Sequence, residues 1–335
     1  MNDNVIVRVA ARGDGVTEDG RYIAHAAPGD ELREDGGLTH GPRHQEPACK
    51  HFPLCGGCQL QHLDEAALED FVRDRVVHAL STHGVEAAEV MPVHLSPPKS
   101  RRRVALRAAW TGKEFHFGFS TEKSHRIIDL QQCEVMTPEL FSLAGNLRIF
   151  LKEHMQKYGH VQIKMAMTGQ GIDLLIENWV AEGLELHEAI SEFAGQNGVA
   201  RLSLDEGYGP TPFWEPEPVT VPLGDVSVAY PPFAFLQATM DGEEKLVEAV
   251  KAITSEAKNV ADLFCGLGTF ALSMADEQKT YAAEADQQAI LALKTAANMT
   301  GRALFTEHRD LFRRPLTAEE LNKFGAVILD PPRAG

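Results

Sequence analysis

Four of the five cysteines have a spacing that could bind a metal ion or a cluster. Cys49, Cys55 and Cys58 follow the pattern C-x5-C-x2-C, and Cys133 stands far downstream in the segment DLQQCEV. Thiolates are soft ligands, so this set could hold a tetrahedral zinc ion or a four-iron cluster. Structural zinc usually has paired C-x2-C units, whereas only one such pair is present here. Three unrelated buried thiols are the simplest alternative, and the odd cysteine count argues against a disulfide framework.

A second constellation has the pattern of a nucleoside site. The segment NVADLFCGLGTFALSMA places an apolar strand before Gly266, Gly268 and a helix that begins at Thr269, and Glu284 ends the next expected strand. In a Rossmann-like sheet the glycines allow a nucleoside to approach, and the acidic residue accepts hydrogen bonds from ribose hydroxyls. The third glycine of dinucleotide-binding turns is absent, which favours adenosylmethionine over NAD.

Asp330 opens the turn Asp-Pro-Pro-Arg at the end of the apolar segment AVILD. Ligands of open α/β sheets bind at the carboxyl ends of the strands, where the prolines would direct Asp330 into the crevice. An ordinary strand-ending turn is the alternative, but the neighbouring nucleoside pattern favours a functional aspartate.

A basic strip without acidic residues covers residues 93–113. Phosphate binding depends on clustered Lys and Arg, so Lys99, Arg101, Arg102 and Arg103 are candidate nucleic-acid contacts. A solvated strand edge is the alternative. The net charge of −16 argues against basic contacts over the whole surface.

Several kinds of element must position these residues. Before residue 41, apolar runs alternate with Gly-Asp and Pro-Gly pairs, which predicts hairpins in a compact β-barrel or half-barrel. An amphipathic helix is expected over 62–84. Residues 93–230 predict a mixed, mostly β region with one helix near 138–158, and the alternation of strands and helices after residue 243 predicts a parallel, doubly wound sheet.

No segment reaches the roughly 20 apolar residues that a membrane helix needs, and the N-terminus lacks the pattern of a signal peptide. We therefore expect a cytoplasmic monomer with no membrane partner.

Taken together, the segments CKHFPLCGGCQLQHL, SPPKSRRRVALR, GFSTEKSHRIIDLQQC, PPFAFLQAT, DLFCGLGTF and LDPPRAG resemble a known family. It is the iron–sulfur branch of the bacterial uracil-C5 RNA methyltransferases that modify 23S ribosomal RNA, and the resemblance covers essentially the whole chain. It implies a shortened TRAM-like β segment over 1–45 and an iron–sulfur and central β domain over 46–62 and 92–230. A connecting helix is expected over 63–91, and the N-terminal part of a Rossmann-like methyltransferase domain, with an incomplete sheet, over 231–335.

The resemblance also implies the ligands of each residue set. Cys49, Cys55, Cys58 and Cys133 would ligate a [4Fe–4S] cluster. The residues expected around adenosylmethionine or the target base are Gln237, Phe264, Thr269, Glu284, Asp310 and Asp330. The family often has Asn in place of Thr269, and Phe-Gln-x-Asn where this chain has the four residues LQAT.

In the family, a Ser-Cys-Asn-Pro segment with the nucleophile and then a glutamate base follow the Asp-Pro-Pro-Arg turn, whereas this chain ends at Gly335. The thiolate would add to carbon 6 of uracil, carbon 5 would attack the sulfonium methyl group, and the base would remove the hydrogen on carbon 5. We therefore expect a truncated enzyme in which Asp330 positions substrate or cofactor and Cys265 is structural. Methylation of transfer RNA and a non-catalytic, RNA-binding or cluster-bearing remnant are the alternatives.

Overall fold

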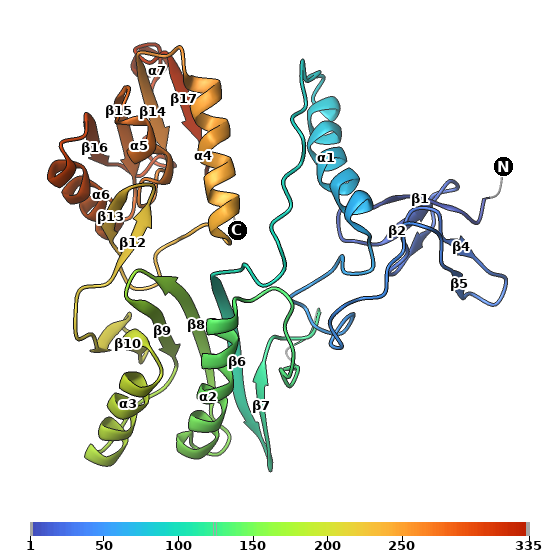
Figure 1. The fold of residues 1–335 in the computed structure, drawn as a ribbon, viewed down its shortest axis with the longest axis horizontal. Coiled ribbons are helices and arrows are strands. Elements are labelled where there is room, and N and C mark those ends of the chain that lie inside the picture. The colour runs from blue at the N-terminus through green and yellow to red at the C-terminus, as the bar shows by residue number, and fades with distance from the viewer. Residues whose placement is uncertain (1–2, 123, 125, 333–335) are drawn as a thin grey trace. The chain divides into compact units, whose positions relative to one another are not determined.

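The computed structural model describes residues 3–122, 124 and 126–332 (Figure 1). The chain divides into two compact units. The first contains residues 1–97 and 116–134, and the second contains 98–115 and 135–335. The cysteine segment therefore groups with the N-terminal strands, whereas the sequence led us to expect it with the central β region. The reason is that residues beyond β7 (Glu114–Gly118) return to the cysteine segment, where Cys55 forms a β-bridge with Thr121.

The first unit contains the hairpins that the sequence predicts. Strands β1 (Ile6–Val9), β2 (Gly15–Thr17) and β3 (Tyr22–Ile23) form one antiparallel sheet, and β4 (Glu31–Leu32) pairs with β5 (Leu38–Thr39). A Cβ at position 15 would lie 2.6 Å from the carbonyl oxygen of Ala26, so glycine is required for this close packing. The TRAM-like assignment of this segment stays a prediction.

Helix α1 (Glu65–Thr82) lies inside the range predicted for it. It begins where the Asp64 carboxylate accepts a hydrogen bond from Ala67 N, a common N-cap arrangement. Its amphipathic character is weaker than predicted, because Phe71 is buried while Val76 is 57% exposed.

The second unit begins with a mixed sheet that contains the strands β11-β10-β9-β8-β6 in this order. These strands are β6 (Arg103–Thr111), β8 (His160–Thr168), β9 (Gly171–Glu177), β10 (Val199–Asp205) and β11 (Thr211–Trp214). Helix α2 (Pro138–His154) matches the predicted helix, and its five buried apolar residues provide its core-facing stripe. A second helix, α3 (Leu184–Gln196), was not predicted from the sequence.

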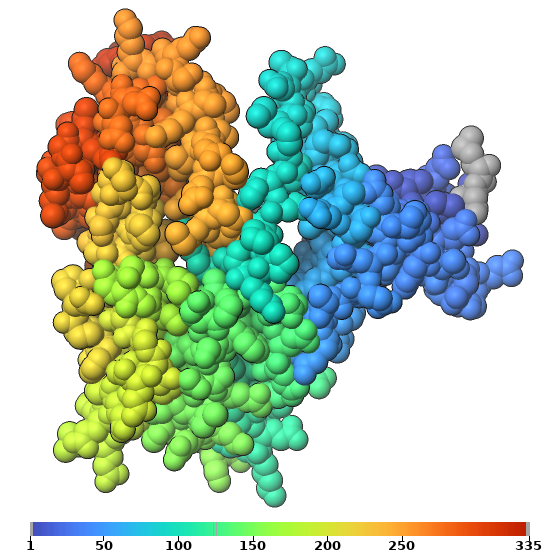
Figure 2. All heavy atoms as spheres, in the orientation of Figure 1, coloured from blue at the N-terminus to red at the C-terminus, as the bar shows by residue number. Residues whose placement is uncertain are grey.

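The hairpin of β12 (Thr220–Leu223) and β13 (Val226–Ala229) precedes the parallel sheet, and Val226 and Val228 share a core cluster with Leu293. The sheet has the order β16-β15-β14-β17, and every neighbouring pair is parallel. Its elements are α4 (Met240–Thr254), β14 (Asn259–Leu263), α5 (Thr269–Met274), β15 (Lys279–Glu284), α6 (Gln287–Thr300), β16 (Leu304–His308), α7 (Ala318–Leu321) and β17 (Ala326–Leu329). The predicted alternation of helices with parallel strands is thus confirmed, and side chains fill the space between these ribbons (Figure 2).

None of the helices in the described part of the chain combines the length and the apolar character that crossing a bilayer would require.

Candidate functional site

The turn that follows β14 has an unusual backbone. Phe264, Gly266 and Gly268 have φ angles of 63°, 54° and 92°, in the left-handed region that favours glycine. Phe264 is the exception to that preference, which makes its conformation a strained one. Gly266 N donates a hydrogen bond of 2.9 Å to Glu284 Oε2, so the turn is joined directly to the end of β15.

The two glycines of this turn have different environments. A Cβ at Gly268 would lie 2.3 Å from Leu293 Cδ1, so this position must be glycine to pack against α6. A Cβ at Gly266 would meet no atom within 4 Å. Of the two predicted ligand-facing glycines, only Gly266 faces open space, where a bound molecule could approach the backbone.

An acidic residue inside β14 was not among the predicted site residues. Asp262 is 0% exposed; its Oδ2 accepts a hydrogen bond of 2.9 Å from Ala271 N, and its Oδ1 has no partner among the described residues. Burial raises the pKa of Asp262 to about 7, and the negative charges of Asp330 and Glu284 act in the same direction. The fold therefore brings three carboxyl groups together at the carboxyl ends of β14, β15 and β17.

The other predicted residues on this side of the sheet are placed as follows. The Asp310 carboxylate accepts hydrogen bonds from Phe312 N and from Arg313 N, at 3.0 and 3.1 Å, and so organises the turn after β16. The Phe312 ring packs 5.2 Å from the Phe264 ring. Thr269 is half-buried at the first position of α5 and Asp330 is exposed, while Arg333 lies outside the described residues.

The basic strip does not form one surface. Arg102 is 3% exposed, its Nη2 lies 2.7 Å from Glu243 Oε2, and its Nε donates to the carbonyl oxygen of Gln237 at 3.0 Å. The prediction that Arg102 contacts nucleic acid is therefore wrong, because its charge is already neutralised inside the protein. Lys99 and Arg101 are exposed.

Arg103 is also directed into the protein. Its Nη1 donates to the Leu236 carbonyl oxygen at 2.8 Å, and its guanidinium lies 4.8 Å from the Phe235 ring and 5.5 Å from the Phe233 ring. Burial lowers the pKa of this half-buried guanidinium. Arg102 and Arg103 together therefore contact the loop that carries Gln237 at two backbone carbonyls and at two aromatic rings.

The four predicted cysteine ligands all lie in the first unit. Cys49 and Cys55 are buried, and Cys58 and Cys133 are partly exposed. Burial raises the pKa of the Cys55 thiol, and the other three thiols raise it further, which means that the four are near neighbours. Within the described residues, no group of three or more His, Cys, Asp or Glu side chains is arranged to hold a metal ion, so this arrangement does not support the zinc and iron–sulfur predictions.

Cys265 has the environment of a structural residue. It is 7% exposed, and burial raises its pKa well above that of an ordinary thiol. A buried thiol that stays protonated is a poor nucleophile, which agrees with the expectation that this cysteine belongs to the turn and takes no part in the chemistry.

Comparison with known proteins places the chain among RNA-modifying enzymes. No family model matches it. An uncharacterised RNA methyltransferase of Zymomonas mobilis is 49% identical over 330 residues, which are 98% of this chain and 83% of the relative. The 23S rRNA (uracil(1939)-C(5))-methyltransferase of Pectobacterium carotovorum is 29% identical over 335 residues, 96% of this chain and 72% of the relative.

A solved structure has the same fold. The tRNA (uracil-54, C5)-methyltransferase of Pyrococcus abyssi, in complex with S-adenosyl-L-homocysteine, aligns with a TM-score of 0.74 and 21% identity over 99% of this chain and 84% of that one. The architecture described above is thus shared with that enzyme. Given the 49% identity to its relative in Zymomonas mobilis, the chain belongs to the RNA methyltransferase family of S-adenosylmethionine-dependent enzymes.

Proposed function

We propose that this protein transfers a methyl group from adenosylmethionine to carbon 5 of a uridine in 23S ribosomal RNA. The support for this substrate is the similarity to the Pectobacterium carotovorum enzyme, which extends over 96% of the chain. Transfer RNA is the alternative substrate, and a non-catalytic RNA-binding protein is the alternative of a different class.

The methyl donor would bind at the carboxyl edge of the parallel sheet. The observation that carries this proposal is that Asp262, Glu284 and Asp330 lie close enough to influence one another's charge. The buried Asp262 Oδ1 has no partner among the described residues, and the backbone of Gly266 faces open space. Carboxylates suit the ribose hydroxyls and the positive charge of adenosylmethionine. The residues proposed to surround donor or base are Gln237, Phe264, Gly266, Gly268, Thr269, Glu284, Asp310 and Asp330.

Each of these residues would bind or orient, while adenosylmethionine supplies the activated methyl group. Glu284 would accept from ribose hydroxyls after exchanging its bond to Gly266 N, and Gly266 would let the ligand approach the backbone. Gln237 would face the base from a loop fixed by Arg102. Asp330 would position substrate or donor from the turn after β17.

Mass spectrometry of RNA from a strain that lacks the gene tests the substrate. We expect one 5-methyluridine to disappear from 23S ribosomal RNA and to return when the gene is restored. Loss from transfer RNA would contradict the proposed substrate, and unchanged methylation in both pools would contradict the activity.

We further propose that Cys49, Cys55, Cys58 and Cys133 hold a [4Fe–4S] cluster. Its support is that the other three thiols raise the pKa of Cys55, together with the close approach of the backbone, where Gly56 N donates to Ser120 O at 3.0 Å. A four-iron cluster spreads its cysteines farther apart than a single ion does, so a set that does not fit one ion is compatible with it. Such a cluster would tie residues 116–134 to the cysteine segment.

Two remaining assignments also stand as proposals. Lys99 and Arg101, the exposed half of the basic strip, would contact RNA phosphates. The hairpins over 1–45 would form a TRAM-like RNA-binding segment, followed by a connecting segment over 63–91 whose helical part is α1.

A further inference from the structure

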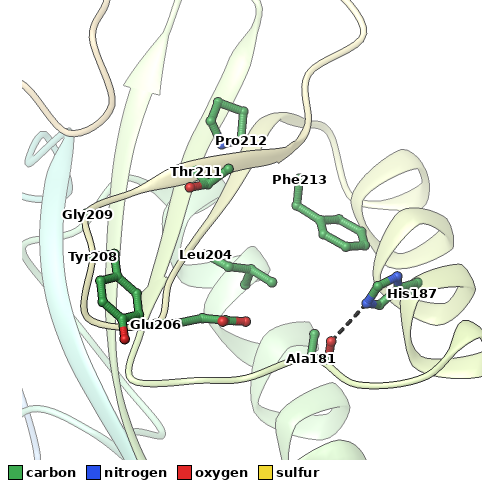
Figure 3. A pocket seen from close by; sticks show the side chains of 9 residues that line it. All are labelled: Ala181, His187, Leu204, Glu206, Tyr208, Gly209, Thr211, Pro212 and Phe213. Atoms are coloured by element: carbon green, nitrogen blue, oxygen red, sulfur yellow. Dashed lines mark hydrogen bonds between the residues drawn. The ribbon is translucent and has the colours of Figure 1, made fainter.

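A pocket in the second unit is lined by residues between 181 and 213, none of which has a role in the sites described above. Its volume is about 320 Å³, and it lies between α3 and the loop that joins β10 to β11 (Figure 3). Figure 3 shows Phe213 beside His187 on the helix side, with Glu206 and Tyr208 on the loop.

Contacts between side chains fix the orientation of the aromatic wall of the pocket. The Phe213 and His187 rings meet edge to face, with centroids 5.1 Å apart. His187 Nε2 lies 2.8 Å from the Ala181 carbonyl oxygen, and because a carbonyl only accepts, this nitrogen carries the hydrogen. The Phe213 face is thereby held toward the pocket as a fixed apolar surface.

The loop presents its side chains to solvent on a fixed backbone. Asp205 Oδ1 accepts hydrogen bonds from Gly207 N and Gly209 N, at 2.7 and 3.0 Å. Between these glycines, Tyr208 is 99% exposed. A fully exposed aromatic ring on a loop with a fixed backbone is typical of a residue that contacts a binding partner.

The surroundings carry a strong negative charge. Residues 181–218 include eight acidic residues and one basic residue, a net charge of −7. The basic residue is Arg201, which is buried and paired with Asp173 at 2.7 Å. The exposed ionic groups of this segment are therefore carboxylates, and one of them, Glu206, lines the pocket. Carboxylates repel RNA phosphates and attract cations.

We propose that this pocket binds an arginine side chain from a basic segment of a partner protein. A guanidinium stacks on aromatic faces such as those of Phe213 and Tyr208, and its planar donors match a carboxylate such as Glu206. A lysine ammonium is a point charge that lacks the planar geometry, so it would gain only the general attraction of the acidic surface.

Fluorescence anisotropy with a labelled Arg-Gly repeat peptide tests this at an ionic strength of about 0.15 M, where long-range attraction is screened. We expect saturable binding that is at least about five-fold tighter than for a Lys-Gly peptide of equal length. Glu206→Gln and Tyr208→Ala should each weaken it by about five-fold. Glu217→Gln removes the same charge outside the pocket and should leave the affinity within about two-fold.

Equal affinity for the two peptides, or equal effects of Glu206→Gln and Glu217→Gln, would mean that only surface charge is recognised and would overturn the proposal. Displacement of the Arg-Gly peptide by an RNA oligonucleotide bound at the same residues would overturn it too. Circular dichroism of each variant checks the fold, and because both pocket substitutions are at exposed positions, the melting curves should match the parent protein.

Discussion

Arg102 Nη2 lies 2.7 Å from Glu243 Oε2, and the two residues are only 3% and 8% exposed. The pair joins the segment before β6 to α4, and Arg102 also holds the carbonyl of Gln237. Removing one partner leaves a buried charge without compensation, so we expect Arg102→Met to lower the free energy of unfolding by about 3–5 kcal/mol. Urea denaturation measures this change.

Two companion variants make that experiment decisive. Arg101→Ala, at the exposed neighbouring position, should change the stability by no more than about 0.5 kcal/mol. The double variant Arg102→Met with Glu243→Leu should recover part of the loss, because no unpaired charge remains. Similar, small effects of Arg101→Ala and Arg102→Met would show that the buried pair contributes little.

Asp262 should make the protein less stable as the pH rises. Burial raises its folded-state pKa to about 7, whereas an aspartate in an unfolded chain titrates near about 3.9. Between these values the folded protein binds one proton more than the unfolded chain, so stability is full below the lower value and falls until the pH passes the upper one. Asp262→Asn stays neutral and should lose this part of the pH dependence.

Urea titrations at about pH 5 and about pH 8 measure the difference for both proteins. The parent protein should lose more stability over this interval than Asp262→Asn. Identical losses would mean that the Asp262 carboxyl is ionised throughout, in contradiction to its buried position beside Glu284 and Asp330.

The parallel sheet was predictable because its signals are local. The segment AVILD contains the whole of β17, and the strand, glycine turn and helix around Gly266 follow one another within a few residues. Helix α3 was missed because it lies among short strands and buries only Ile190, Phe193 and Ala194, so its apolar stripe is narrow.

The partners of charged residues were not predictable in the same way. Arg102 stands in a basic run, and its neutralising partner Glu243 is 141 residues away, so only the fold reveals that this arginine is buried. Asp262 sits inside an apolar strand, where pattern alone suggests a structural position. Its relation to Glu284 and Asp330 depends on strand order, which no local spacing contains.

The two glycines after β14 should respond differently to the same substitution. Gly268→Ala would place a Cβ 2.3 Å from Leu293 Cδ1 at a φ of 92°, which should cost about 1–3 kcal/mol of stability. Gly266→Ala meets no atom within 4 Å and should cost only about 1 kcal/mol for its left-handed backbone. Calorimetry should nevertheless find weaker adenosylmethionine binding by Gly266→Ala, and unchanged affinity would exclude the open space as the donor site.

The cysteine set should account for the iron of the protein. Anaerobically purified protein should contain iron and absorb broadly in the visible range, and Cys55→Ser should lose most of both signals. Cys265→Ser is the matched control, because this thiol is buried in the second unit and lies outside the set. Iron-free parent protein would contradict the cluster, whereas bound zinc released by a chelator would favour the tetrahedral alternative.

The exposed and inward-facing arginines should differ in how they affect RNA binding. Arg101→Ala should weaken binding to ribosomal RNA fragments and lower the slope of log K against log salt by about one, because one phosphate contact is lost. Arg103→Ala should leave that slope unchanged, because its guanidinium is bonded to the Leu236 carbonyl and stacked on Phe235. Filter binding over a range of salt concentrations separates the two. If Arg103→Ala lowered the slope as much as Arg101→Ala, the Arg103 guanidinium would have to leave its aromatic contact to reach the RNA. If Arg101→Ala changed neither the affinity nor the slope, Arg101 would belong to the ordinary solvent-exposed surface.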